Sequence, residues 1–549
     1  MSLKPSAIEP VPLETARVAR LAFPSGAPAM QIRDVLGTLY DDDAFADLFP
    51  TRGQPAEAPW RLALVTVLQF MEGLSDRQAA QGVRRCIDWK YALSLELTDP
   101  GFDFSVLSEF RSRLIAGHAE ERLLTRVLEL FKERGWLKAR GHQRTDSTHV
   151  LASVRALNRL ETVGETLRAA LNILAEIAPD WLRTQVTPEW FDRYSHRVED
   201  YRLPQGREAR ARYAEVIGTD GCRLLEAMDK EATLHWLREV PAVKILRQVW
   251  EQQYVLEEGH LRWRTAKELA SAGERIESPY DPEARFGNKR TVTWTGYKAH
   301  VTETCDDESP HLITDVQTTV AQVPDVSMTE TIQLALVKKE VSPQEHLLDA
   351  GYVDADLLVR SKRDLGIEVI GPVRPDSSWQ AQSAQGYDVA HFTVDWQEHQ
   401  VVCPQGHLNT CWTPHEDAYG NPVISVKFSR TDCRLCPARS LCTRSDEAPR
   451  HVTLRVQTDH EMLQHAREVQ TTSEWKERYD QRAGIEGTLS QGLRVCDLRQ
   501  ARYVGLPKTH LQHVATAVAL NFLRVVAWMN GNKRATTRRS RFAALALAG

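Results

Sequence analysis

Residues 289–321, KRTVTWTGYKAHVTETCDDESPHLITDVQTTVA, decide the fold of this chain. The segments 289–307 and 311–321 are rich in β-branched and aromatic residues, which is typical of strands. The polar DDESP turn between them predicts that the two strands pair as a β-hairpin. The order of the segments that follow then decides what kind of sheet the hairpin begins.

After the hairpin, helix-like and strand-like segments alternate. We expect a helix over 325–340, a strand over 345–352, a helix over 354–366 and a strand over 368–373. A hairpin followed by this alternation predicts an α/β fold around a sheet with mixed strand directions. Asp349 ends the HLLD strand, which is the place where open α/β sheets bind ligands and carry out chemistry.

A second aspartate lies in an earlier strand-like segment. In HQRTDSTHVL, residues 142–151, β-branched residues alternate with polar ones, and Asp146 is near the middle. Within the hairpin, Lys298 and His300 share one strand face. We interpret that face as solvated, with a phosphate contact by Lys298 as the alternative.

The N-terminal region, residues 1–140, has helical patterns. Ser75 and Gln78 have the spacing of a capping box. A short helix further along the region is expected to expose Arg111 and Arg113. Short helices with arginines on polar faces are typical of a DNA-binding module, although an ordinary helical bundle gives the same pattern.

The cysteines are concentrated in one part of the chain. Five of the nine fall between residues 403 and 442, and an odd count without an export signal argues against a disulfide framework. The C-x₂-C spacing with further Cys and His nearby is typical of a structural zinc site. Reduced thiols without metal and an iron–sulfur cluster remain alternatives. The predicted ligands are Cys403, Cys433, Cys436 and Cys442, with His407 or Cys411 as substitutes.

Composition and charge narrow the class of protein. With 549 residues, 42% of them hydrophobic and 26% charged, the chain has the composition of a globular protein with several structural units. No long apolar run and no secretory signal are present, so we expect a cytoplasmic protein. The net charge of −5 does not favour nucleic acid binding. However, nine Lys or Arg and no Asp or Glu follow from Arg499 onward, which predicts either a phosphate-contacting arm or a solvated basic terminus.

Residues 473–495, SEWKERYDQRAGIEGTLSQGLRV, predict a helix with Tyr479, Arg482 and Glu486 on one face. The glycines at 484 and 487 weaken a helix by roughly 1 kcal/mol each relative to alanine. We interpret them as clearance for a DNA backbone or a second element. The alternative is a simple Arg–Glu pair on the helix surface.

Asp146, Asp349 and Glu486, in this order and on these elements, resemble the catalytic acids of DDE insertion-sequence transposases, which have a ribonuclease H-like fold. YDQRAGIEG carries the Tyr-x₂-Arg-x₃-Glu signature of one branch, and TDSTHV and LLDAGYVDADLL resemble the two Asp segments. The resemblance covers residues from about 60 to 530. It implies that the three acids hold two Mg²⁺ or Mn²⁺ ions, since paired divalent cations catalyse phosphoryl transfer on nucleic acids.

The same resemblance implies a set of DNA-contacting residues in the C-terminal region. Many relatives have a basic residue seven positions after the Glu, but position 493 is Leu here. Either the neighbouring Arg494 takes over that role, or the role is absent. The expected DNA-contacting residues are Tyr479, Arg482, Arg494, Arg502 and Lys508.

The function implied is that of a transposase. It binds the terminal inverted repeats of its element in double-stranded DNA, cuts at the element ends and joins the 3′-hydroxyl to target DNA, as a homodimer or larger assembly. A nuclease that does not join DNA and a non-enzymatic DNA-binding derivative are the alternatives. The expected segments are an N-terminal helical, DNA-binding domain (1–140), the first part of the core (141–372) with a helical insertion (about 155–275), a β-rich cysteine insertion (373–455), the C-terminal helices of the core (456–530) and a basic tail (531–549).

Overall fold

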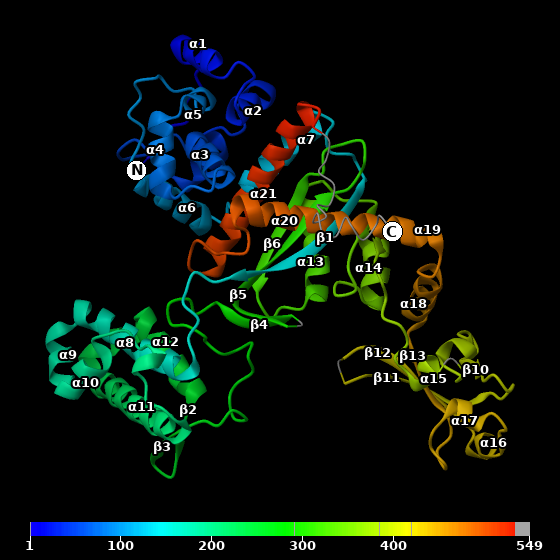
Figure 1. Cartoon of the computed structure of the whole chain (residues 1–549). Helices are drawn as coiled ribbons and strands as arrows, with labels where there is room; N and C mark the ends of the chain where they lie inside the picture. Colours follow the sequence, from blue (N-terminus) through cyan, green and yellow to red (C-terminus); the bar gives the residue numbers. More distant parts are fainter. Residues whose placement is uncertain (1, 290, 384, 419, 533–549) are drawn as a thin grey trace, which may run out of the picture.

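The computed structural model describes residues 2–289, 291–383, 385–418 and 420–532. A mixed sheet lies at its centre, and three groups of elements project from it: the N-terminal helices, a helical insertion and a small β-rich insertion (Figure 1). The predicted basic tail lies almost wholly outside the described residues. The prediction of a mixed α/β fold is confirmed.

The central sheet has six strands, and its central strand carries Asp146. Strand β5 pairs antiparallel with β1, β4 and β6, whereas β1, β7 and β8 run parallel. The hairpin predicted around DDESP is therefore present as β5–β6. Strand β4 was not predicted. The strands are β1 (His142–Leu151), β4 (Arg285–Lys289), β5 (Val292–Thr304), β6 (Ile313–Val320), β7 (Glu345–Leu347) and β8 (Glu368–Ile370).

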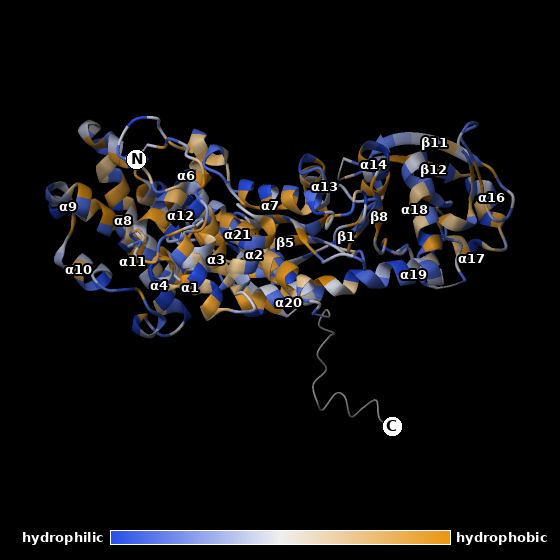
Figure 2. Cartoon of the chain, turned by 90° about the horizontal axis from the view of Figure 1, so that it is seen from above, coloured by the Kyte–Doolittle hydropathy of each residue, from blue (hydrophilic) through white to orange (hydrophobic). Residues whose placement is uncertain are grey.

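Helices cover both faces of this sheet. Seen from above, α13 (Met328–Lys338) and α14 (Ala355–Leu365) lie on one side of the strands and α19 (Ser473–Asp480) and α20 (Gly484–Cys496) on the other (Figure 2). The Asp354 side chain accepts a hydrogen bond from the Leu357 N–H and so caps α14. Helices α13 and α14 correspond to the two helices predicted in the alternation after the hairpin.

Helix α21 (Leu506–Met529) is the most apolar long helix of the described chain. By length and composition alone it would qualify to cross a membrane, but 78% of its most apolar window is buried inside the protein. It packs against β6 and against α3 of the N-terminal region. It is therefore a core helix that joins the sheet to the N-terminal helices.

The N-terminal helices share one hydrophobic core with α21 and the sheet. The predicted capping box is confirmed, because the Ser75 hydroxyl accepts from the Gln78 N–H and the Gln78 side chain accepts from the Ser75 N–H. The predicted exposure of Arg111 is wrong: this side chain is buried and pairs with Asp76. Arg113 is half-buried and pairs with Glu109. The helices are α1 (Leu13–Ala22), α2 (Pro28–Leu36), α3 (Pro59–Met71), α4 (Asp76–Arg85), α5 (Ile87–Ala92), α6 (Ser105–Ala116) and α7 (Arg122–Glu133).

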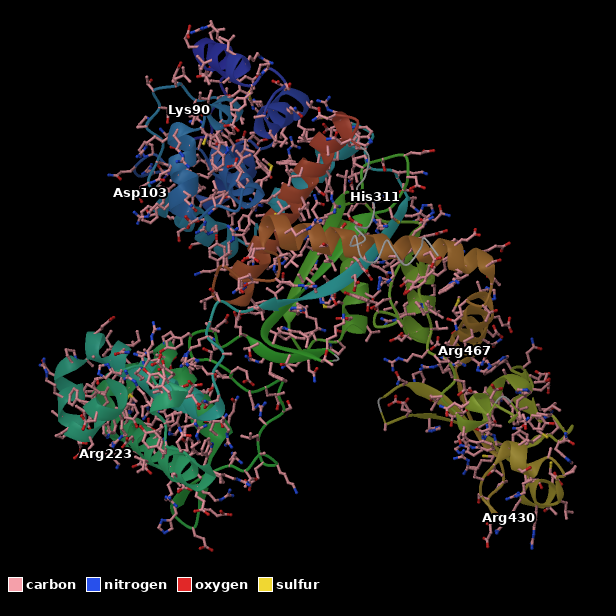
Figure 3. All side chains as sticks on the ribbon, viewed as in Figure 1. Lys90, Asp103, Arg223, His311, Arg430 and Arg467 are labelled. Atoms are coloured by element: carbon pink, nitrogen blue, oxygen red, sulfur yellow. The ribbon has the colours of Figure 1, made fainter. Side chains whose placement is uncertain are left out.

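Between β1 and β4 the chain forms a helical unit with its own core. It also contains a two-stranded hairpin, β2–β3, which the helical pattern of 155–275 did not predict. Arg223 of this unit and Arg430 of the cysteine insertion lie on separate lobes (Figure 3). The elements are α8 (Arg159–Ile177), α9 (Pro179–Gln185), α10 (Pro188–Tyr194), α11 (Arg207–Lys230), α12 (Pro241–Gln253), β2 (Tyr254–Glu257) and β3 (His260–Trp263).

After β8 the chain forms the cysteine insertion, a small unit whose core has two sheets. The chain then returns to the centre through α18. The segment predicted as one helix over 473–495 is instead α19, a 3₁₀ turn η6 (Gln481–Ala483) and α20. The elements of the insertion and the return are α15 (Trp379–Gln382), β9 (Thr393–Asp395), β10 (Gln400–Val402), β11 (Asn409–Glu416), β12 (Pro422–Phe428), α16 (Arg430–Leu435), α17 (Arg439–Cys442), β13 (His451–Arg455) and α18 (Gln457–Val469).

Candidate active site

The sheet brings Asp146 and Asp349 to the same level. Strands β1 and β7 are parallel, and their last paired residues are Arg144 and Leu347. Asp146 and Asp349 each lie two residues further along, so both carboxylates are carried past the same point of the sheet. Asp349, which was expected at a ligand-binding edge of the sheet, therefore lies next to Asp146.

A single guanidinium lies between the two aspartates. The Nη2 atom of Arg482 is 3.5 Å from Asp146 Oδ2 and 3.7 Å from Asp349 Oδ2. The side chains are only 13%, 12% and 27% exposed, in the order Arg482, Asp146, Asp349. Two carboxylates thus turn an oxygen toward one partly buried cation.

Burial and charge act on Asp146 in opposite directions. Burial raises the pKa of Asp146, and the neighbouring Asp349 adds to that increase, whereas Arg482 favours the ionised form. The Arg482 Nε atom is buried and has no hydrogen-bond partner among the described residues. The two ion pairs with Asp146 and Asp349 are therefore the main contacts that hold the guanidinium, whose hydrogen bonding is incomplete.

Glu486 does not join this pair. It is exposed in the first turn of α20, and within the described residues it makes no hydrogen bond or ion pair. Thr488, two residues later, is buried and donates to Glu303, so the 100° step per residue directs Glu486 to the opposite side of the helix. The alternative of an Arg482–Glu486 surface pair is wrong, since Arg482 pairs with the aspartates. In the described part of the chain, no group of three or more His, Cys, Asp or Glu side chains is arranged to hold a metal ion.

The two glycines near Glu486 have different surroundings. A Cβ atom at Gly484 would overlap the guanidinium of Arg144, which donates to the carbonyl of Gln481. The clearance at Gly484 is therefore for a second element, strand β1, which is one of the two possibilities predicted. A Cβ at Gly487 would meet no atom within 4 Å.

A third aspartate lies near the pair and was missed. Asp325, in the 3₁₀ turn η4 (Asp325–Ser327), accepts from Ser147 Oγ at 3.1 Å and from Lys298 Nζ at 2.8 Å. Ser147 in turn donates its N–H to Asp146. The solvated face predicted for Lys298 and His300 is wrong, because His300 is fully buried and Lys298 is bound to Asp325. Only an aspartate at a helix start is visible in the sequence, so nothing local indicated this contact.

Two family models match the chain. Residues 402–526 match the one described as Transposase DDE domain, and residues 21–113 match the one described as Transposase domain (DUF772). Both matches support an insertion-sequence DDE transposase. No curated protein and no solved structure matches this transposase. The first match includes Glu486 and most of the cysteine insertion, but neither Asp146 nor Asp349.

The predicted DNA-contacting residues of the transposase are in different environments. Arg494 and Lys508 are exposed, and Arg494 donates to the Ser490 carbonyl of its own helix. Arg502 donates to the Leu74 carbonyl and lies 4.6 Å over the Phe70 ring, so it joins the C-terminal region to α3. The Arg502 guanidinium is therefore engaged within the protein, and its predicted contact with phosphate stays a prediction.

Tyr479 and Leu493 are both partly buried. The Tyr479 ring is half-buried and stacks on Trp475, with ring centroids 4.8 Å apart. Leu493 is half-buried, and the neighbouring Arg494 is exposed. Of the predicted contacts in the transposase, Arg494 and Lys508 are thus the freest to meet a phosphate.

The four predicted zinc ligands also meet in this transposase. Cys403, Cys433, Cys436 and Cys442 all line one pocket of the cysteine insertion, together with His407. Cys411 does not line it. The spacing of the cysteines therefore identified neighbours in space, although the side chains do not form a metal-binding group within the described residues.

Proposed function

We propose that the central sheet and its helices form a ribonuclease H-like catalytic core. Support comes from the strand order, in which β6, β5 and β1 are successive antiparallel neighbours and β7 and β8 then continue parallel to β1. Support also comes from the helical coverage of both faces. The helical unit and the cysteine unit are then insertions into this core, and residues 1–140 form its N-terminal helical domain, proposed to bind DNA.

The proposed reaction is DNA cleavage at the ends of the element followed by joining of the 3′-hydroxyl to target DNA. The observation that carries it is the convergence of Asp146 and Asp349 on one cation in a DDE transposase. Carboxylate oxygens are the donors that Mg²⁺ and Mn²⁺ prefer, and this pair already faces a positive charge. The donor set therefore fits a divalent cation.

Asp146, Asp349 and Glu486 are the proposed ligands of two such ions. When bound, the ions supply the positive charge that activates an attacking oxygen and stabilises a leaving one. For Glu486 to reach the aspartates, η6 and the first turn of α20 must shift, and this segment also carries Arg482. One movement of this segment would then withdraw Arg482 from between the aspartates and bring Glu486 toward them.

The remaining residues would bind and orient DNA. Arg494 and Lys508 offer exposed positive charge near α20 and at the start of α21, and Tyr479 and Arg482 lie beside the acids. Phosphate contacts of this kind position DNA without reading its sequence. We further propose a cytoplasmic homodimer or larger assembly, because element ends are processed as pairs.

The test is incubation of the purified chain with Mg²⁺ or Mn²⁺, labelled element ends and a target plasmid. Cleavage followed by joined product is expected, and Asp146→Asn and Asp349→Asn should abolish both. Cleavage without joining would indicate the nuclease alternative. Binding without metal-dependent cleavage, together with no effect of the two substitutions, would indicate a non-enzymatic DNA-binding derivative.

A further inference from the structure

We propose that Cys403, Cys433, Cys436 and Cys442 bind one structural Zn²⁺ ion in the cysteine insertion. This site is distinct from the acid pair and does not depend on the proposed reaction. Four thiolates are a closed ligand set for tetrahedral zinc, which has a structural role because no coordination position remains open.

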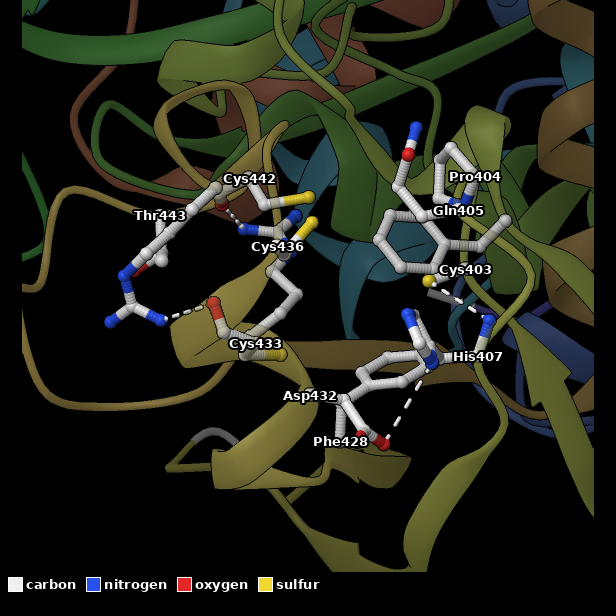
Figure 4. A pocket seen from close by; sticks show the side chains of 13 residues that line it. Cys403, Pro404, Gln405, His407, Phe428, Asp432, Cys433, Cys436, Cys442 and Thr443 are labelled. Atoms are coloured by element: carbon white, nitrogen blue, oxygen red, sulfur yellow. Dashed lines mark hydrogen bonds and ion pairs between the residues drawn. The ribbon is translucent and has the colours of Figure 1, made fainter.

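The four cysteines come from two separate segments that border the same pocket. Cys403 directly follows β10, whereas the other three lie in or next to the short helices α16 and α17. In the close-up, the four sulfur atoms lie around a common space between these segments (Figure 4). A metal ion there would connect the β-strand half of the unit to its helical half.

The loop that carries Cys403 is shaped around its sulfur. The Cys403 N–H donates to the His407 carbonyl, and the Gly406 N–H donates to the Cys403 carbonyl, both at 2.9 Å. In the turn so formed, the His407 N–H points back to Cys403 Sγ at 3.4 Å. A backbone N–H directed at sulfur stabilises the thiolate form, which is the form that binds metal.

The backbone around the other ligands is held by two arginines. Arg439 donates to the Cys433 carbonyl at 2.8 Å, and Arg450 donates to the Cys442 carbonyl at 2.9 Å. Both arginines also line the pocket. Positive charge and fixed carbonyls around four thiols provide the kind of supporting shell that orients metal ligands.

The four thiols border one pocket but still have to approach one another to share one ion. In the described residues no three side chains yet have metal-binding geometry, so the thiols must rotate toward one another as they bind. Their shared pocket permits this rotation without a change in the order of the strands or helices.

Cys411, the remaining cysteine of the insertion, lies apart from the four proposed ligands. Cys411 lies in β11, its sulfur is 3.1 Å from Thr413 Oγ1, and it is not among the residues that line the pocket. It is therefore excluded as a ligand. Cys411→Ser provides a control that removes one thiol from the same unit and leaves the four ligands intact.

The experiment measures metal in the full-length chain, expressed with zinc in the medium and purified under reducing conditions. Elemental analysis is expected to find one zinc per chain in the wild type and in Cys411→Ser, and at least a tenfold loss in Cys433→Ser and Cys436→Ser. Zinc absent from the wild type, or retained in Cys436→Ser, would overturn the proposal. Iron with acid-labile sulfide in place of zinc would overturn it too.

A second measurement covers the case in which the serine variants do not fold. The wild-type chain is treated with chelator and then titrated with Co²⁺. One equivalent is expected to produce the charge-transfer absorption of Co²⁺ bound to four thiolates, and one equivalent of Zn²⁺ should remove it. Absence of this absorption in folded protein would refute the site. Since DNA is not part of either measurement, failure of the zinc proposal is distinguishable from failure of the transposase reaction.

Discussion

Replacing Arg482 by glutamine tests whether its guanidinium is the counter-ion of the aspartate pair. The two contacts, 3.5 Å and 3.7 Å long, join side chains that are between 12% and 27% exposed. Exposed ion pairs contribute up to about 1 kcal/mol, and breaking fully buried ones costs about 3–5 kcal/mol. For this intermediate burial, Arg482→Gln should lower the metal-free free energy of unfolding by roughly 2 kcal/mol.

The same substitution should have the opposite effect on metal binding. In the wild type, a divalent cation must displace the guanidinium before it meets both carboxylates. In Arg482→Gln that cost is absent, so the Kd for Mn²⁺ should fall about tenfold or more, which corresponds to about 1.4 kcal/mol. Destabilisation without metal together with tighter metal binding is a combination that a purely structural arginine would not produce.

The assay is urea unfolding with and without Mn²⁺, combined with direct Mn²⁺ titration. Arg494→Gln is the matched control, because it removes an exposed arginine from the neighbouring helix α20. A double-mutant cycle with Asp146→Asn should give a coupling energy of about 1–2 kcal/mol. If Arg482→Gln behaves like Arg494→Gln in both stability and Mn²⁺ affinity, Arg482 is not the counter-ion of the pair.

Three further predictions follow from other contacts. Gly484→Ala should lower stability by roughly 2 kcal/mol because its Cβ overlaps the Arg144 guanidinium, whereas Gly487→Ala, with open space inside helix α20, should raise stability by up to roughly 1 kcal/mol; equal effects in thermal unfolding would contradict this assignment. Burial lowers the pKa of His300 from 6.5 to about 4, so its contribution to stability is complete above pH 6.5 and falls by up to roughly 3 kcal/mol toward pH 4. Between pH 6.5 and pH 4, His300→Gln should reduce the dependence of the unfolding free energy on pH. An unchanged dependence would refute this role of His300. Chelator should accelerate trypsin cleavage within the cysteine insertion, equally in wild type and Cys411→Ser; an unchanged cleavage pattern would argue against a metal-supported fold.

The arrangement of Asp146 and Asp349 illustrates what local patterns predict well. The hairpin at 289–321 and the following alternation indicated a mixed sheet, and each aspartate was assigned to a strand or a strand end. The parallel pairing of β1 with β7 is a long-range choice, yet the short helical connections after the hairpin favour it. Two of the three proposed acids therefore become neighbours because of features visible in the sequence.

Several contacts that did not follow from the sequence are made by long polar side chains across distant elements. Arg111 was expected in solvent, but Asp76, on another helix, gives it a buried partner. At Gly484 the sequence left open whether DNA or a second element needs the space, and the atoms that need it belong to Arg144, more than three hundred residues away. Helical period predicts which face a residue occupies, but it does not predict which charge from elsewhere in the fold will meet it.

The packing of Arg502 on α3 would affect the distance along DNA between the bound sequence and the cleavage position. Arg502 binds the Leu74 carbonyl and covers the Phe70 ring, and the N-terminal helices share their hydrophobic core with α21 and the sheet. Such a joint resists bending, so the N-terminal helices and the aspartate pair keep a constant separation. A DNA sequence held by those helices would then be cut at a fixed number of base pairs from its recognised end, because the rigid protein core sets that distance.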